Sequence, residues 1–290
     1  MKYKLSEIAL FNPTETLKKG TLAKKVGMDK LQPFCRDIPD YEIAEFSGGM
    51  KFRNGDTIMA RITPCLENGK TAKVNILDTE EVGFGSTEYI VFRAIDGVTD
   101  EDYLYYLVCS PIVRDIAIKS MVGSSGRQRV QTDVVKGIEV ELPTLDEQRK
   151  IGSLLKILDD KIAVNNEINE NLEQQAQAIY CDMFITNANP SWQLGRLSDL
   201  IAVRYGKNHK KLADGIYPVY GSGGIMRYAE KPLYDKESVL IPRKGTLNNV
   251  MYVNKPFWSV DTMFFTEMKL PNVAKFVFHF VAHCIMKLHT

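Results

Sequence analysis

Residues 143–183 read PTLDEQRKIGSLLKILDDKIAVNNEINENLEQQAQAIYCDM, and the rest of the chain is organised around this stretch. Gly152 is its only glycine, and after Pro143 no proline occurs until Pro190. Apolar or small residues, with asparagine at the two central positions, recur at alternating steps of four and three, which is the heptad period of a coiled-coil helix. The positions of this stripe are Ile151, Leu155, Leu158, Ile162, Asn165, Asn169, Leu172, Ala176, Ile179 and Met183.

The start of this stretch also carries a helix signal. Thr144 is a suitable N-cap, and Glu147, three residues later, can complete a capping box. About forty residues at a rise of 1.5 Å per residue would form a rod of roughly 55–60 Å. Because so narrow an apolar stripe is marginal as an isolated helix in water, we expect a partner helix, with the asparagines fixing its register. The alternative is an ordinary long helix packed on its own domain.

Composition bounds the class of protein. A chain of 290 residues with 44% apolar and 25% charged residues is typical of a soluble globular protein with two domains. A net charge of +1 means that any attraction to nucleic acid must be local. The sequence begins without an apolar leader and has no long apolar run, which predicts a cytoplasmic protein that does not enter a membrane. The five cysteines are scattered, so we expect reduced thiols and neither disulfides nor a zinc site.

Residues 1–142 are predicted to form one mixed α and β domain. Turn residues and β-branched runs predict strands over 57–62, 71–74 and 88–93. Helical spacing of apolar residues predicts helix over 100–118, capped by Thr99, with a second helix beginning at Pro111.

Residues 187–290 resemble the first half of the chain. Three segments repeat in the same order: 197–201 repeats 5–9, 237–243 repeats 55–61, and 258–264 repeats 84–90. Ordered repeats of this kind indicate a tandem duplication. We therefore predict an α+β fold in which two similar mixed domains, 1–142 and 187–290, are joined by a long coiled-coil-type helix over 143–186. The second copy has no counterpart of the loop 123–129, so we expect that domain to be incomplete.

Several short motifs resemble enzyme signatures, but each lacks a residue that the chemistry requires or has a simpler explanation. Gly69-Lys70-Thr71 resembles the end of a phosphate-binding loop, but Pro64 stands where the first glycine is required. His279 and His283 have the spacing of a zinc helix without its glutamate. Asp159-Asp160-Lys161 fits a nuclease fragment, but it lies on the predicted helix, where a solvated charged face is the simpler interpretation. We expect no catalytic residues and no metal ligands in this chain.

Polar and basic loops instead suggest a surface that binds nucleic acid. Hydroxyls and backbone amides suit phosphate oxygens, arginine suits guanine edges and glutamine suits adenine. Each candidate taken alone could equally be ordinary solvated surface. The candidates form four clusters: Ser124, Ser125, Arg127, Gln128 and Arg129; Arg61, Asn68, Lys70 and Lys73; Arg204, Tyr205, Lys207, Lys210 and Lys211; and Tyr220, Ser222, Arg243, Lys244 and Thr246.

Three segments together resemble the specificity subunit of type I DNA restriction–modification systems. They are GSSGRQRV at 123–130, LPTLDEQRKI at 142–151 and NLEQQA at 171–176. Gly55-Asp56 before a strand and Asn68-Gly69-Lys70 also fit the target recognition domains of that family.

The resemblance implies that the chain selects a bipartite site on double-stranded DNA, one half per target recognition domain, with the helix as spacer and docking element. Methyltransferase subunits carrying S-adenosylmethionine would methylate adenine. A restriction subunit would translocate and cut DNA with ATP and magnesium, and this chain would bind no cofactor and catalyse nothing. Self-association through the helix is a further expectation. The alternative is a stand-alone coiled-coil DNA-binding or scaffold protein, possibly an inactive truncated specificity subunit.

Overall fold

The computed structural model describes residues 2–288, which form a mixed α and β fold in two compact units divided between residues 167 and 168. Helix α5 runs from Leu145 to Cys181 and contributes residues to both units. A short π-helix, Asp182–Thr186, follows it directly. The long helix predicted from the heptad stripe is confirmed.

The first turn of α5 is held by the predicted capping box. The backbone N–H of Thr144 donates to Glu147 Oε2 at 2.9 Å, and the backbone N–H of Glu147 lies 3.4 Å from Thr144 Oγ1. The two residues thus satisfy each other's backbone donors at a helix end, where donors have no partner within the helix.

Unit 1 contains four short helices and ten strands among its described residues. The helices are α1 (Leu5–Ile8), α2 (Glu101–Cys109), α3 (Pro111–Lys119) and α4 (Thr132–Lys136). The strands are β1 (Lys2–Lys4), β2 (Ala9–Phe11), β3 (Leu22–Val26), β4 (Glu42–Glu45), β5 (Met50–Phe52), β6 (Thr57–Ala60), β7 (Thr71–Lys73), β8 (Gly83–Gly85), β9 (Tyr89–Ala94) and β10 (Glu139–Glu141).

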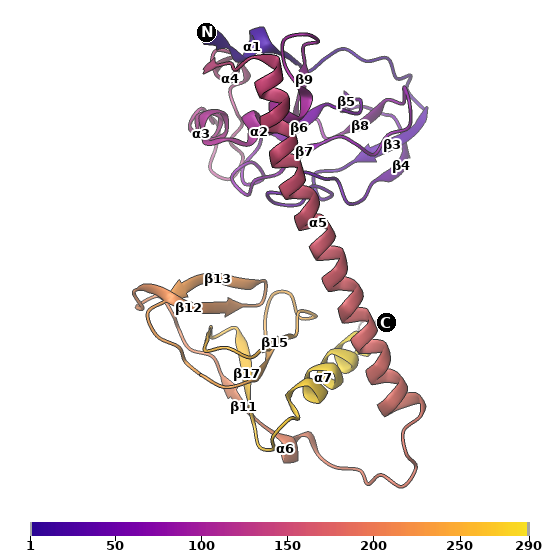
Figure 1. Ribbon diagram of the computed structural model, residues 1–290, viewed down its shortest axis with the longest axis vertical. Helices are drawn as coiled ribbons and strands as arrows, with labels where there is room; N and C mark the ends of the chain where they lie inside the picture. The colour runs from indigo at the N-terminus through magenta and orange to yellow at the C-terminus, as the bar shows by residue number, and fades with distance from the viewer. Residues whose placement is uncertain (1, 289–290) are drawn as a thin grey trace. The chain divides into compact units, whose positions relative to one another are not determined.

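These strands form two four-stranded sheets and one two-stranded ribbon. The sheet β2-β9-β6-β7 is antiparallel, the sheet β4-β3-β8-β5 contains a parallel β3–β8 pair, and β1 pairs with β10. Figure 1 shows the sheet β2-β9-β6-β7 between the short helices on one side and the sheet β4-β3-β8-β5 on the other.

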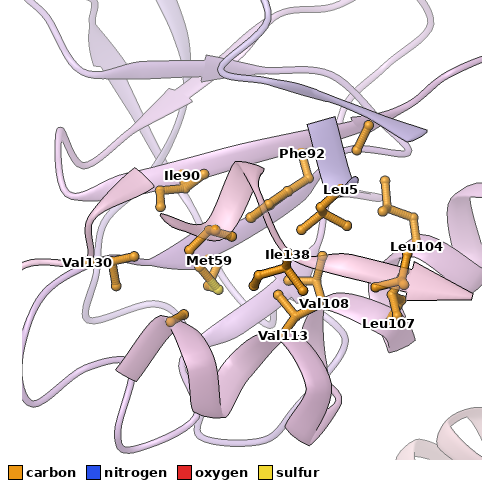
Figure 2. Packing of buried hydrophobic residues seen from close by; sticks show 14 of the residues in the cluster. Leu5, Met59, Ile90, Phe92, Leu104, Leu107, Val108, Val113, Val130 and Ile138 are labelled. Carbon is orange, nitrogen blue, oxygen red and sulfur yellow. The ribbon is translucent and has the colours of Figure 1, made fainter. Parts of the chain in front are cut away.

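The central strands β6 and β9 are apolar on both faces because a core lies on each side of them. Met59, Ile90 and Phe92 pack in the cluster that includes Leu104 and Val108 of α2 (Figure 2). The alternate residues of the same strands, including Ile58 and Val91, belong to a second core cluster. This alternation follows from the two-residue period of a strand, and it explains why β6 and β9 read as nearly continuous apolar runs.

The N-terminus of α2 differs from the prediction. Asp100 is the N-cap, and its side chain accepts a hydrogen bond from the backbone N–H of Tyr103 at 3.0 Å. Thr99 is instead buried, and its hydroxyl donates to the backbone oxygen of Ile8 at 2.7 Å. Thr99 was predicted as the cap because either residue type suits that position, and only the long-range contact to Ile8 separates them.

Unit 2 contains two helices of its own besides the end of α5. They are α6 (Leu197–Leu200) and α7 (Ala274–Leu288). Its strands are β11 (Ile201–Tyr205), β12 (Asp214–Gly221), β13 (Gly224–Ala229), β14 (Ser238–Pro242), β15 (Met251–Val253), β16 (Trp258–Ser259) and β17 (Met263–Met268). Figure 1 shows α7 and the β12–β13 pair on opposite sides of the remaining strands of this unit.

The topology of unit 2 repeats that of unit 1. The sheet β11-β17-β14-β15 has the strand order and pairing directions of β2-β9-β6-β7, and the parallel pair β12–β16 repeats β3–β8. Even the first helical turn is repeated: the backbone N–H of Lys4 donates to Glu7, and that of Arg196 donates to Asp199. The duplication predicted from three sequence echoes is confirmed.

In unit 2 the end of α5 packs on α7. The buried Tyr180 stacks on the ring of His279, with centroids 5.8 Å apart, and His279 Nδ1 lies 3.0 Å from Gln177 Oε1. His283 Nδ1 lies 3.8 Å from the sulfur of Cys181. The histidine pair of α7 therefore takes part in helix packing, and within residues 2–288 no three ligand-type side chains are grouped to hold a metal ion. No helix in this range is long and apolar enough to cross a membrane.

Candidate nucleic-acid interface

The basic loop predicted at 123–129 forms a hairpin tip in unit 1. Val122 and Arg129 pair through two backbone hydrogen bonds of 3.0 and 2.9 Å. The turn closes with a 3.0 Å bond from the N–H of Arg127 to the oxygen of Ser124, and it is made possible by the positive φ of 78° at Gly126. The side chains of Ser124, Ser125 and Arg127 are exposed, so their hydroxyls and guanidinium are available to a partner.

The base of this hairpin is attached to the residues that follow β6. The N–H of Val130 donates to the oxygen of Arg61 at 2.8 Å, and the N–H of Thr63 donates to the oxygen of Gln128 at 3.0 Å. Arg61 was predicted in a separate cluster from the loop, and the structure brings the two together. An open cavity of about 500 Å³ lies here, lined by Arg61, Val122, Arg129, Val130, Gln131, Thr132 and Asp133.

Glu88 organises the charge at the base of the hairpin, although sequence reasoning did not select it. Arg129 binds its carboxylate in a forked arrangement, with Nη2 and Nε at 2.7 and 2.9 Å from Oε1. Arg61 Nε lies 3.9 Å from Oε2 and has no hydrogen-bond partner among the residues that the structure describes. The hydrogen bond from Arg129 lowers the pKa of Glu88, and Glu88 raises the pKa of Arg129, so both groups are charged at neutral pH.

The other three residues predicted beside Arg61 are separated by the fold. Asn68 is exposed, whereas Lys70 donates from Nζ to the backbone oxygen of Met28 at 2.7 Å. Lys73 is buried and forms ion pairs with Glu101, at 2.9 Å, and with Asp102. Its charge is neutralised inside the unit, where it ties β7 to the first turn of α2, so Lys73 is less accessible to a partner than Asn68.

In unit 2 two predicted clusters meet at Arg243. Its guanidinium carbon lies 4.9 Å from the ring centroid of Tyr205 and 5.1 Å from that of Phe264, within the range of a cation–π contact. Its Nη1 donates to the backbone oxygen of Asp261 at 3.1 Å. The aromatic rings hold the arginine in place, while its side chain remains exposed.

The remaining candidates of unit 2 differ in how accessible they are. Arg204 forms a 3.0 Å ion pair with Glu267. Tyr220 is partly buried, which raises the pKa of its hydroxyl, and the backbone oxygen of Ser222 accepts a bond from Asn249 at 2.8 Å. Arg204 is nevertheless exposed, as are Lys207, Lys210, Lys211, Lys244 and Thr246.

The stripe predicted on α5 is largely open to solvent. Leu155 and Ala176 are partly buried, but most of the stripe is exposed: Ile151, Leu158, Ile162, Asn165, Asn169, Leu172, Ile179 and Met183. The arrangement agrees with an unpartnered helix face, although the described residues include no partner that would test the predicted pairing.

Comparisons with known proteins agree with this architecture. The family described as the type I restriction modification DNA specificity domain matches residues 1–174 and 189–290. The chain is 35% identical over 104 residues to the type I restriction enzyme EcoAI specificity subunit of Escherichia coli, which covers 36% of this chain and 18% of that protein. It is 31% identical over 160 residues to the EcoEI specificity subunit of the same organism, covering 53% of this chain and 27% of that protein. The matches thus span less than a third of these relatives.

The fold is also found among solved structures. The type I restriction–modification S subunit from M. genitalium matches 99% of this chain and 79% of its own, with a TM-score of 0.54 and 16% sequence identity.

Proposed function

Because the chain belongs to the family of the type I restriction modification DNA specificity domain, we propose that it is a DNA-recognition subunit that selects a sequence on double-stranded DNA. The observation that carries the proposal is the hairpin 122–129, which exposes Ser124, Ser125 and Arg127 beside Arg61. Hydroxyl and guanidinium groups on a protruding turn suit phosphate oxygens and the edges of bases in a groove.

Unit 2 would supply a second reading surface around Arg243. The exposed Lys207 and Lys244 would contact phosphates, and Arg243, held by the rings of Tyr205 and Phe264, would face the DNA. A preorganised arginine loses less conformational entropy on binding than a free one, which strengthens its contact with the DNA.

The repeated topology supports a bipartite target, because two similar readers suit two half-sites. In this proposal residues 1–142 form the first target recognition domain and 187–290 the second. The helical segment 143–186 then sets the spacing of the half-sites. Its exposed stripe would pair with the same helix of a second copy, and light scattering would reveal the pairing as a dimer.

We further infer that the chemistry belongs to partner subunits. Methyltransferase subunits would use S-adenosylmethionine to methylate adenine, and a restriction subunit would use ATP and magnesium to translocate and cut. This chain would direct them without binding a cofactor, as a soluble component of the cytoplasm.

Two measurements test the proposal in the source cells. Mapping of methylated adenines in DNA from cells with and without the gene should reveal a split motif that disappears with the gene. Tagged chain should co-purify with a methyltransferase subunit. Unchanged methylation together with no such partner would refute the assignment and favour a stand-alone coiled-coil protein.

The hairpin can be tested separately. Arg127→Ala should remove one phosphate contact and so reduce the slope of log K against log salt by about 0.9. The loss of affinity between 50 and 200 mM salt should then be about 3.5-fold smaller than in the wild-type protein. Arg149→Ala removes the same charge from α5 and serves as the control. Equal effects of the two variants would mean that the hairpin is not part of the interface.

A further inference from the structure

Arg61 and Arg243 occupy the same position in the two units. Each directly follows the second of the two inner strands of its sheet in the order β2-β9-β6-β7 or β11-β17-β14-β15, namely β6 in unit 1 and β14 in unit 2. The N–H of Arg61 donates to the oxygen of Glu88, and the N–H of Arg243 donates to the oxygen of Thr262, both at 2.9 Å. Glu88 and Thr262 directly precede β9 and β17, so these two residues are equivalent as well.

The two positions differ in charge. In unit 1 the carboxylate of Glu88, with a side chain 24% exposed, binds Arg129 in a fork and lies near Arg61. One negative charge therefore offsets two guanidinium groups at the edge of the cavity. A DNA phosphate approaching Arg129 would have to displace this carboxylate or tolerate its repulsion.

In unit 2 the equivalent side chain is the uncharged Thr262. Among the described residues no carboxylate forms an ion pair with Arg243, which rests on two aromatic rings and binds a backbone oxygen. Lys244 is exposed beside it. Both positive charges are therefore free to meet phosphate.

We propose that the residue at the Glu88/Thr262 position determines how strongly each reader holds the DNA backbone. Glu88 restrains phosphate binding by unit 1 and leaves its affinity dependent on base contacts, whereas Thr262 lets unit 2 anchor on phosphate through Arg243. This inference rests on the proposed DNA-binding function. It assigns a specificity-determining role to a residue that makes no positive contribution to DNA affinity.

Reciprocal substitutions test the inference. The chain, purified with any subunits that accompany it, would be titrated with a random-sequence duplex at several salt concentrations between 50 and 200 mM. Each phosphate contact contributes about 0.9 to the slope of log K against log salt, which is about 3.5-fold in affinity over a fourfold salt range. Glu88→Thr should steepen the slope by about 0.9 to 1.8, and Thr262→Glu should reduce it by about 0.9.

Neutral isosteres separate charge from shape. Glu88→Gln should steepen the slope as Glu88→Thr does, and Thr262→Gln should leave it unchanged. Glu45→Thr removes a carboxylate from the exposed edge strand β4 and controls for net charge. Far-UV circular dichroism of each variant confirms folding.

The outcomes distinguish two failures. Wild-type protein with no salt-dependent affinity for DNA would refute the proposed function and the inference together. Wild-type binding with slopes that Glu88→Thr and Thr262→Glu leave unchanged would overturn the inference alone. A slope that steepens equally in Glu88→Thr and Glu45→Thr would also overturn it, because the effect would be one of net charge.

Discussion

Gln148 should contribute more to the stability of unit 1 than any exposed residue of α5. It is 1% exposed, and its amide nitrogen donates to the backbone oxygens of Val98 and Pro143 at 3.1 and 3.0 Å. Its amide oxygen accepts from the N–H of Asp100 at 3.0 Å. One side chain thus joins the first turn of α5 to the segment that begins α2.

Gln148→Met keeps the length of the side chain and removes all three hydrogen bonds. At about 1 kcal/mol each, the free energy of unfolding of unit 1 should fall by about 3 kcal/mol. With a urea dependence of about 2 kcal/mol per molar, the midpoint should fall by about 1.5 M. Gln175→Met, at an exposed position on the same helix, should change the free energy by less than about 0.5 kcal/mol.

Two spectroscopic probes can localise the effect. The chain has two tryptophans, Trp192 and Trp258, and both lie in unit 2. In urea titrations Gln148→Met should therefore shift the transition seen by far-UV circular dichroism and leave the transition seen by tryptophan fluorescence in place. Identical circular dichroism midpoints for the Gln148 and Gln175 variants would refute the reasoning, since the buried amide would then contribute nothing.

Three other predictions concern stability, pH and assembly. Arg93→Ala should lower the free energy of unfolding of unit 1 by about 3–5 kcal/mol in a urea titration. The reason is that Asp56, which is 1% exposed, would lose both of its 2.7 Å ion-pair bonds. The control Arg149→Ala, which removes an exposed ion pair, should lower it by under about 0.5 kcal/mol. Burial lowers the pKa of His279 below 6.5, so the unfolded state binds the proton more tightly than the folded state. The stability of unit 2 should therefore decrease as the pH falls through 6.5 toward that lowered value, and tryptophan fluorescence can follow the change. A stability that is independent of pH in this range would contradict the burial argument. Leu158 is 51% exposed on the α5 stripe, so Leu158→Glu should abolish any dimer detected by light scattering without lowering the helix content, and an unchanged dimer would exclude the stripe as the contact.

The features that sequence predicted correctly depend on contacts between near neighbours. The heptad stripe and the capping box of Thr144 and Glu147 involve residues three or four apart on one helix, so their spacing is visible in the chain. The duplication was visible because each copy kept the apolar pattern of its central strands. The edge strands β4 and β5 were missed because four and three residues are too few to show a strand period.

The charges at the candidate interface could not be assigned in the same way. Lys73 and Asp102 are 29 residues apart, and Glu88 and Arg129 are 41 apart, so no local spacing signals that they pair. In the sequence, Lys73 has the character of a phosphate contact, but in the structure it is buried and its charge is neutralised by two ion pairs. Glu88 carries no signal in the sequence beyond its position before a strand. Neither ion pair could be predicted from the sequence because the Coulomb interaction depends on distance in space and on burial, which sequence spacing does not report.

By itself, the sequence determined a long capped helix, two related α+β halves and a family resemblance. Helix period and capping chemistry are visible from residues close together in the chain, and repetition is visible when the chain is compared with itself. The tertiary structure alone decided which arginines are free and which are held by a carboxylate. Arg129 forms an ion pair with Glu88, and Arg243 packs on two aromatic rings, because the packing of distant strands and loops brings those groups within a few ångströms of each other.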